Sequence, residues 1–479
     1  MIKFLKLYKF QILIVLGILA MYCTFAYDLE RADFVKLITL YAGLTFLSYK
    51  LIQLMKVNFT TLVIIGVLFR FVFLFAMPNL SQDFYRFIWD GRMLISGENP
   101  YLSTPAQWAV TSDYYFAQGQ QLVDGMGALN ASHFTNYPPI NQLFFAMGAM
   151  IGWESISGTL IAYRILLIFA DLGIVIIGRK LLEDLKLPEH RIFWYFLNPF
   201  VIIEFAGNIH FEGMMLFFLL SGIYMLYHGR WFYAALLIGV SISVKLIPLI
   251  FLPLLWKFLI KERKTNKLKP SKTSIFKLLG FYVTVALSVF LTFMPFLTGF
   301  LVDNFAQSVA LWFQKFEFNA SIFYIIREIG FSIKGYNVLT KVTPYLATIT
   351  FLFVVGLSIF GKGVRLKPLI ATMVFSIFFY FLLSTTVHPW YAATPLLLCL
   401  FTRYRFPLLW AGTVMLSYYA YGVEEVKENY WLLGLEYGSV VLFMLYEIFW
   451  LQPKEKEKEK APKKISKAYL EYMSRPEIS

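Results

Sequence analysis

Apolar residues in this chain form long runs, and short polar stretches separate the runs. Most runs are roughly 17–25 residues long, the length that an α-helix needs to cross about 30 Å of hydrocarbon. The runs predict crossings at 10–27, 34–54, 59–78, 159–178, 193–207, 213–228, 276–297, 341–360, 368–386, 390–402, 407–421 and 431–450. With two further passes in 231–260, the pattern predicts an all-α, polytopic transmembrane helical bundle of about fourteen crossings.

Two apolar stretches do not fit a simple crossing. The run 138–153 is short and begins with Pro138 and Pro139, which predicts a re-entrant or surface-lying helix. The stretch 231–260 has basic residues at both ends, and Lys245-Leu-Ile-Pro248 in its middle could turn the chain. Broken helices at membrane depth are tolerated where they line protein or a wet cavity, so we expect a cavity here.

Two segments are too long and too polar for ordinary connections. The segment 79–136 contains a plausible amphipathic helix near 82–96, followed by a stretch rich in Gly, Gln, Asp and Ser. The segment 298–338 is expected to be a second large loop. Because Lys and Arg concentrate in the alternate short loops, both long segments are predicted on the external side and both termini in the cytoplasm.

The chain is therefore expected to have three parts. Residues 1–57 form an N-terminal transmembrane hairpin, residues 58–452 form the main bundle, and residues 453–479 form a basic cytoplasmic tail. The tail is rich in Lys and Glu, which is typical of a solvated segment that anchors topology against anionic membrane lipid. The lack of soluble modules fits a bacterial inner membrane.

The amino-acid composition supports the prediction of a membrane protein. Hydrophobic residues make up 59% of the 479 positions and charged residues only 15%, whereas soluble domains carry about 25% charged residues. The net charge is +14, and the Lys and Arg residues that cause it cluster in the short loops between apolar runs. Their distribution indicates membrane topology rather than nucleic-acid binding. Cys23 and Cys399 lie in apolar runs and give neither a disulfide framework nor metal-ligand spacing.

The densest polar cluster lies at the start of the first long external segment. On a helix, Asp83, Arg86 and Asp90 share one face. A carboxylate at this position is suited to act as a general base, or with its neighbour to bind a divalent cation. An Asp–Arg network that merely pins the segment explains the spacing equally well.

Lys245 is the strongest candidate elsewhere, because ionisable residues inside a membrane are costly and mark function by default. An ammonium in this apolar stretch suits an anionic phosphate, and snorkelling to the interface is the less favoured alternative. No Walker A motif, dinucleotide loop or nucleophile elbow appears, and no soluble domain is present for a nucleotide sugar. Their absence favours a lipid-linked substrate that reaches an external cavity.

Several stretches in order along residues 60–400 resemble the GT-C superfamily of integral-membrane glycosyltransferases. They are Asp83-Phe-Tyr-Arg-Phe-Ile-Trp-Asp-Gly-Arg92 with Asn99-Pro-Tyr, Asn136-Tyr-Pro-Pro, Asn198-Pro-Phe with Gly207-Asn-Ile-His-Phe-Glu212, Lys245-Leu-Ile-Pro, Phe318-Asn-Ala-Ser321 and His388-Pro-Trp-Tyr391. The set is most similar to the bacterial polyprenol-phosphate-mannose-dependent α-mannosyltransferases.

The resemblance implies inverting transfer of a hexose, expected to be mannose, from a polyprenyl-phosphate-sugar to a glycolipid or glycan acceptor at the external (periplasmic) face. By motif position, it implies Asp83 as the catalytic base. The second carboxylate is Asp90 rather than part of an Asp-x-Asp pair, which leaves a divalent cation at Asp83 and Asp90 as an open alternative to no metal.

We expect Lys245, Arg86 and Arg92 to bind the donor phosphate. The residues expected to bind the rest of the substrates are Asp90, Tyr137, Asn208, His210, Glu212, Asn319, His388, Trp390 and Tyr391.

Two other functions remain open from the residues. A transporter or flippase for a lipid-linked or anionic solute would also use broken helices and a buried Lys. It predicts inverted-repeat symmetry, which the chain does not show, and polar residues on both sides of the bundle. A polysaccharide polymerase or ligase of the same membrane type would differ only in its acceptor.

Overall fold

The computed structural model describes residues 2–111, 116–261, 268, 270–314, 316–422 and 427–451. The predicted tail, 453–479, lies outside these residues. The described part of the chain is helical and contains no β-strand, only two isolated bridges that join Lys261 to Leu268 and Phe318 to Thr386. The predicted all-α class is therefore confirmed.

The helices up to the middle of the chain are α1 (Ile2–Tyr27), α2 (Phe34–Met55), α3 (Phe59–Phe71), α4 (Asp83–Ile95), α5 (Pro105–Thr111), α6 (Gly119–Ala131), α7 (Pro139–Gly152), α8 (Ile156–Asp184), η1 (Glu189–Ile192), α9 (Phe193–Phe196), α10 (Pro199–Val201), η2 (Ile202–Gly207), α11 (Glu212–Tyr227) and α12 (Trp231–Val244). The remaining helices are η3 (Ile247–Leu254), α13 (Trp256–Ile260), α14 (Lys272–Phe293), η4 (Met294–Phe296), α15 (Leu301–Gln314), α16 (Ile322–Lys334), α17 (Leu339–Phe360), α18 (Leu366–Leu383), η5 (Pro389–Ala392), α19 (Ala393–Cys399), α20 (Phe406–Thr413), η6 (Val414–Tyr421), α21 (Tyr430–Tyr446) and η7 (Glu447–Leu451).

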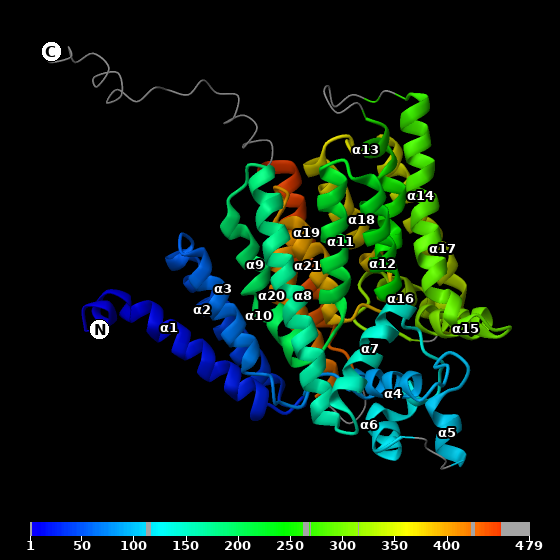
Figure 1. Cartoon of the computed structure of the whole chain (residues 1–479), viewed down its shortest axis with the longest axis horizontal. Coiled ribbons are helices and arrows are strands. Elements are labelled where there is room, and N and C mark those ends of the chain that lie inside the picture. The colour runs from blue at the N-terminus through cyan, green and yellow to red at the C-terminus, as the bar shows by residue number, and fades with distance from the viewer. Residues whose placement is uncertain are drawn as a thin grey trace.

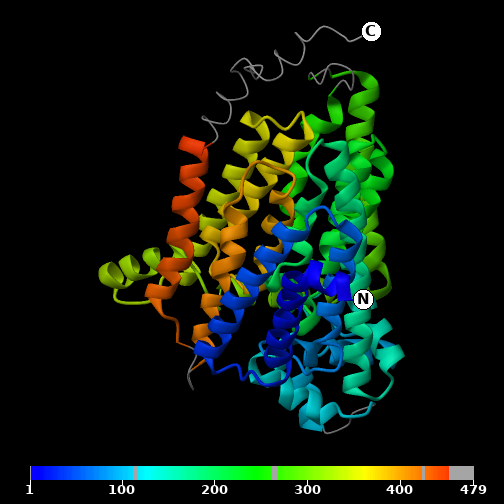
Figure 2. The same ribbon diagram turned by 90° about the vertical axis from the view of Figure 1, so that its left-hand side faces the viewer.

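The long helices pack side by side in a bundle (Figure 1). Helices α4, α5 and α6 lie together at one end, and α13 lies at the opposite end (Figure 1). The view turned by 90° shows the same cyan cluster below the bundle (Figure 2). The segment between α3 and α7 is thus a folded cap on one end of the bundle.

Seven helical stretches are long and apolar enough to cross a bilayer by length and composition. They are 8–27, 34–55, 156–184, 272–296, 339–360, 366–383 and 430–451. An eighth candidate is the pair 199–207 and 212–227, which meet at 116° across a short break. The predicted total of about fourteen is not reached by this criterion within the described residues, and it stays a prediction.

Three sequence expectations about local structure need correction. The stretch 193–207 is not one regular crossing, because Pro199 interrupts it and residues 202–207 form a π-helical turn. The stretches 390–402 and 407–421 are also broken, into short α-helices and 3₁₀ turns. The segment 298–338 is mostly helical, in α15 and α16, rather than a loop. The Gly-rich stretch of the first external segment, for which no local structure was predicted, forms α6, which is kinked at Gly127.

Other local expectations are confirmed. Helix α4 occupies the predicted position near 82–96, although nearly all of its residues are buried rather than one amphipathic face. Helix α12 ends at Val244, and Lys245 takes an extended conformation before the 3₁₀ helix η3 begins at Ile247. The break predicted in 231–260 is therefore real.

Candidate active site

Four interruptions of the bundle meet near the N-terminus of α4. They are the start of α4 itself, the break between η2 and α11, the break after α12 and the turn before η5. Eight predicted site residues come together there through contacts or electrostatic interactions: Asp83, Tyr137, His210, Glu212, Lys245, His388, Trp390 and Tyr391. The structure thus assembles most of the predicted set in one place.

The break between η2 and α11 is held in an unusual backbone geometry. Ile209 has a φ of +63°, a conformation that a β-branched residue adopts at a steric cost of order 1–3 kcal/mol. Arg164 of α8 donates to the carbonyls of Ala206 and Gly207, at 2.6 and 3.1 Å. These bonds satisfy carbonyls at the end of the π-helical turn and fix the position of the residue that follows, His210.

His210 lies between two carboxylates. Its Nδ1 is 2.9 Å from Oε2 of Glu204, and its Nε2 is 4.0 Å from Oδ2 of Asp83. The imidazole is fully buried, and Nε2 has no hydrogen-bond partner among the described residues. An acceptor-only carboxylate at Nδ1 favours the tautomer with the proton on that nitrogen, so the lone pair of Nε2 faces Asp83.

Glu204 was missed by the sequence analysis. Its side chain is fully buried, accepts a 2.9 Å hydrogen bond from the Tyr418 hydroxyl and a 3.4 Å bond from Asn208 Nδ2, and contacts His210. A sequence signal was present, because Glu204 is a lone acid in the apolar stretch Pro199–Gly207 and such residues are functional candidates by default.

Asp83 begins α4 and faces this buried pair. Its side chain is 25% exposed, and its Oδ1 accepts a 3.3 Å hydrogen bond from Asn130. A carboxylate at this place can receive a proton from a bound molecule on one side and approach His210 on the other. Asp83 is thus the acidic group of the cluster that is both partly exposed and next to a buried histidine.

An aromatic column fixes the plane of the His210 ring. Trp390 stacks on His210 at 3.6 Å between ring centroids and on His388 at 4.5 Å, and Phe318 stacks on the far side of His388 at 5.5 Å. Both faces of Trp390 are therefore covered by protein. A sugar cannot stack on either face of Trp390 in this arrangement, so it could contact only the edge of the ring.

Lys245 forms an ion pair with Glu212, the first residue of α11. The Glu212 carboxylate is fully buried, whereas the Lys245 side chain is 15% exposed and its ammonium lies 5.8 Å from the centre of the Tyr137 ring. An ammonium has three donors, so a bond to Glu212 does not prevent it from binding a phosphate oxygen as well. The expected role of Lys245 is compatible with this geometry.

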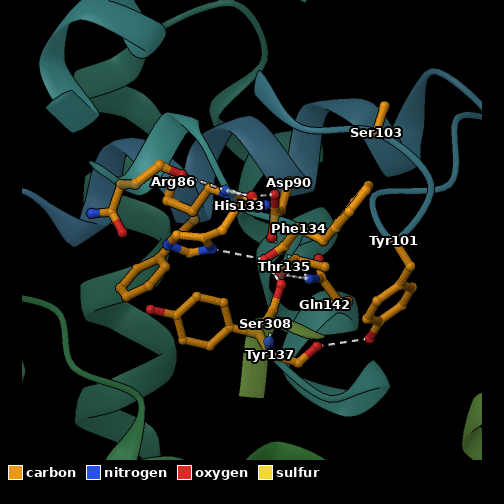
Figure 3. Close-up of polar contacts among 12 residues, drawn as sticks. Arg86, Asp90, Tyr101, Ser103, His133, Phe134, Thr135, Tyr137, Gln142 and Ser308 are labelled. Carbon is orange, nitrogen blue, oxygen red and sulfur yellow. Dashed lines mark hydrogen bonds and ion pairs between the residues drawn. The ribbon is translucent and has the colours of Figure 1, made fainter. Parts of the chain in front are cut away.

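Tyr137 is held at the site by a polar network, which Figure 3 shows. The Tyr101 hydroxyl donates to the Tyr137 carbonyl at 2.7 Å, and the Tyr137 backbone N–H donates to Thr135. The Ser308 hydroxyl of α15 donates to the carbonyl of Phe134 at 2.8 Å. Burial raises the pKa of the Tyr137 phenol well above its usual value, so the hydroxyl stays protonated at neutral pH and can act as a donor.

Arg86 and Asp90 form a buried part of the same network (Figure 3). Arg86 Nε bonds Oδ1 of Asp90 at 2.8 Å and its Nη1 bonds the carbonyls of Asn130 and His133, while Gln142 donates to the other carboxylate oxygen of Asp90. Both side chains are almost fully buried. These contacts correspond to the pinning network considered from the sequence, and they leave Asp83 outside it.

The geometry does not fit a divalent cation between Asp83 and Asp90. Asp90 is fully buried, and both of its carboxylate oxygens already accept hydrogen bonds from protein side chains. No group of three or more possible ligands is found in the part of the chain that the structure describes. A cation there would have to break the pair of Asp90 with Arg86.

Three predicted site residues have other contacts in the structure. Arg92 is buried and donates to Gln118 and to the carbonyls of Ala117 and Glu154, which tie the cap together. Asn319 donates to Glu436, and Asn208 accepts from the backbone of Leu80. These contacts, like those of Arg86, favour roles in holding the cap and the loops rather than in direct phosphate or sugar binding.

An apolar groove of about 680 Å³ lies between η3, α14 and α15. Leu249 and Leu252 of η3 line it, and the other lining residues come from α14 and α15 and from the segment between them, up to Ala306. In the sequence, Leu249 follows Lys245 by four residues. A molecule with an anionic head and an apolar tail would match this order of charge and apolar surface along the chain.

The long apolar spans define an integral membrane protein. Residues 14–261, just over half of the chain, match the family described as "Alpha-(1->6)-mannopyranosyltransferase, N-terminal domain". The chain belongs to this family. The match covers Asp83, Glu204, His210 and Lys245, while His388 and Trp390 lie beyond it.

Two relatives carry the name "Alpha-(1->6)-mannopyranosyltransferase A". The protein from Corynebacterium glutamicum is 25% identical over 189 residues, which are 38% of this chain and 35% of that protein. The protein from Mycobacterium tuberculosis is 26% identical over 200 residues, which are 41% of this chain and 37% of that protein. The similarity thus spans little more than a third of either relative.

Proposed function

We propose that the chain is an inverting glycosyltransferase that moves a mannosyl residue from a polyprenyl-phosphate-mannose donor to a lipid-linked or glycan acceptor, at the outer face of a bacterial inner membrane. The observation that carries the proposal is the position of Asp83, which faces the buried His210, a residue that the Lys245–Glu212 pair also influences. Membership of an α-(1→6)-mannopyranosyltransferase family supports mannose as the transferred sugar and α-(1→6) as the linkage that is formed.

The proposed reaction is a single displacement. Asp83 accepts the proton of the acceptor hydroxyl as that oxygen bonds to the anomeric carbon, and the bond from that carbon to the donor phosphate oxygen breaks. Because attack and departure occur on opposite faces of the sugar, the anomeric configuration inverts. General-base catalysis of this kind contributes about 10²–10⁴-fold to rate.

Lys245 is proposed to bind the departing phosphate. Negative charge grows on the leaving phosphate oxygen in the transition state, and a fixed ammonium stabilises it there. The apolar groove that begins at Leu249 would take the first isoprene units of the donor tail. Its apolar lining, and Leu249 following Lys245 by four residues in the sequence, support an isoprenoid chain as the occupant.

The sugar hydroxyls are proposed to bind polar side chains around Asp83 and Lys245. The Tyr137 phenol is a neutral donor, and Glu212 offers a carboxylate oxygen that has no hydrogen-bond partner among the described residues. His388 and Tyr391 lie beside them and stay candidates for the same role. Groups of this kind distinguish sugars because an unpaired buried polar atom is costly.

Family membership favours transfer over the transporter alternative. A transfer assay separates the two: purified protein in detergent receives radiolabelled polyprenyl-phosphate-mannose and a panel of mannosylated lipid and oligosaccharide acceptors. Labelled product that an α-mannosidase removes is expected. GDP-mannose is the matched donor control; transfer from it alone would contradict the lipid-linked donor, and no product from any donor would contradict the proposed function.

A further inference from the structure

We propose that His210, whose Nδ1 contacts Glu204, is a proton-relay residue. It accepts the proton that Asp83 takes from the acceptor hydroxyl. The inference rests on the proposed function and adds a step to it. It starts from the unpaired Nε2 atom, which is buried and lies 4.0 Å from Oδ2 of Asp83.

The tautomer and the orientation of the imidazole are fixed by the protein. Glu204 accepts the Nδ1 hydrogen at 2.9 Å, and stacking on Trp390 sets the ring plane. Tyr418 and Asn208 donate to Glu204, so this carboxylate accepts up to three hydrogen bonds when ionised. An ionised Glu204 stabilises a positive charge on His210 and so offsets part of the cost of burying that charge.

The distance from Nε2 to Asp83 is about 1 Å longer than a hydrogen bond. Catalytic hydrogen bonds are often long in the absence of substrate and shorten in the reactive complex. Asp83 is partly exposed and its other oxygen has only a 3.3 Å bond, to Asn130, so a rotation of its carboxylate can close the gap. His210 cannot move in the same way, because it is packed on all sides.

The step balances as a proton transfer alone. The acceptor O–H bond breaks as an O–H bond forms on Asp83; that bond then breaks as an N–H bond forms on His210 Nε2. The product is an imidazolium between two carboxylates, and no electrons are gained or lost. Burial lowers the pKa of the His210 imidazole from 6.5 to about 4, close to the value of about 3.9 for a free aspartate, so the proton can pass from Asp83 to His210 at little cost in free energy.

Other charges around His210 act on the same proton. The titratable and charged groups that face it or its direct partners are Asp83 of α4, Glu204 of η2, Glu212 of α11, Lys245 after α12, His388 before η5, Tyr418 of η6 and Arg31 before α2. Lys245 is already paired with Glu212, which reduces the effect of both on the imidazole. Glu204 is the partner in direct contact with the ring.

The test compares kcat and KM of His210→Gln with those of the unchanged protein, measured with polyprenyl-phosphate-mannose in detergent. His210 acts on the proton only after the substrates are bound, so its loss should lower kcat and leave KM nearly unchanged. We expect kcat to fall about 10–100-fold. A folded variant with an unchanged kcat, or with its loss in KM, would overturn the relay.

Two further variants complete the test. Glu204→Gln retains the shape of the carboxylate but removes its charge, so it should lower kcat in the same way even if His210→Gln does not fold. His228→Gln is the matched control, because His228 lies at the other end of α11 and bonds Asp184 there. If the unchanged protein transfers mannose but neither folded variant lowers kcat, the relay is wrong and the proposed function stands.

Discussion

At the residue scale, the site depends on buried polar groups whose contacts could not be read from sequence spacing. Asp83, Arg86 and Asp90 share a helix face as expected, yet Arg86 bonds Asp90 and leaves Asp83 to face His210. Spacing alone could not decide between a general base and an Asp–Arg network that pins the segment. In the structure, Arg86 and Asp90 form the network, and Asp83 is left as the candidate base. The partner of His210, Glu204, lies six residues before it across a π-helical turn, a geometry that no helical periodicity predicts.

His133 gives a prediction for stability against pH. Burial, and next the charge of Arg86, lower the pKa of His133 from 6.5 to about 4. Above pH 6.5 the histidine is neutral in both folded and unfolded chains, so its full contribution is present there. As pH falls from 6.5 towards 4, the unfolded chain binds the proton first, and the free energy of unfolding drops by about 3 kcal/mol.

The variant His133→Gln should lose less stability over the same range, because glutamine does not titrate. Thermal unfolding in detergent at pH 7 and pH 4.5 measures the difference. Equal losses of stability in the unchanged protein and the variant would contradict the assignment of a buried, neutral His133.

A second residue-scale prediction concerns the buried ion pair of Arg70 and Asp171. The two side chains are 2.8 Å apart, and both are at most 2% exposed. Removing one partner leaves an uncompensated buried charge, which costs about 3–5 kcal/mol. Arg70→Met should therefore lower the free energy of unfolding in a denaturant titration by that amount, and the double variant Arg70→Met, Asp171→Leu should recover most of it. A double variant as unstable as the single one would contradict the explanation.

At the element scale, breaks rather than regular spans build the site. The sequence predicted the break at Lys245 because basic residues at both ends of 231–260 are incompatible with one crossing. It did not predict the π-helical turn before His210, because a π-turn is set by tertiary contacts such as those of Arg164. It also took 298–338 for a loop, since length and hydropathy do not distinguish a loop from helices that lie outside the long spans.

The contact between α4 and α7 offers an element-scale prediction. A Cβ on Gly91 would overlap the carbonyl of Phe145 on α7, and backbone atoms cannot move aside cheaply. Gly91→Ala should cost about 1–3 kcal/mol in stability and lower kcat, because α4 carries Asp83.

Gly434→Ala is the matched control for this substitution. Gly434 is an exposed helical glycine of α21 with open space around it, so alanine there should be neutral or stabilise by up to about 1 kcal/mol. Unfolding midpoints and transfer rates compare the two variants. An unimpaired Gly91→Ala protein would show that α4 and α7 are not packed as described.

At the scale of the whole molecule, the bundle separates two ends of different character. Helices α4, α5 and α6 form a cap at one end, and α13 lies at the other (Figure 1). The helical bundle and the gathering of polar clusters followed from hydropathy and charge, because both are set by a pattern that runs along the whole chain. The number of crossings could not be predicted in this way, because short and broken helices such as α9, α10, α19 and α20 cannot be counted from apolar runs.

The predicted orientation can be tested by labelling single cysteines. In a chain with Cys23 and Cys399 replaced by Ser, Asp124→Cys lies on the exposed surface of α6 and Lys362→Cys on an exposed turn between α17 and α18. A membrane-impermeant maleimide should label position 124 in intact cells and position 362 only after permeabilisation. The opposite pattern would place the cap in the cytoplasm and contradict an external site.

The most direct test of the central claim is transfer by Asp83→Asn beside the unchanged protein. Both are purified in detergent, their unfolding temperatures are compared, and single-turnover transfer from polyprenyl-phosphate-mannose is followed. Asparagine keeps the size and the bond with Asn130 but cannot accept a proton, so the account predicts an equally stable protein whose rate falls by about 10²–10⁴-fold. A folded Asp83→Asn protein that transfers mannose at an undiminished rate would contradict Asp83 as the base.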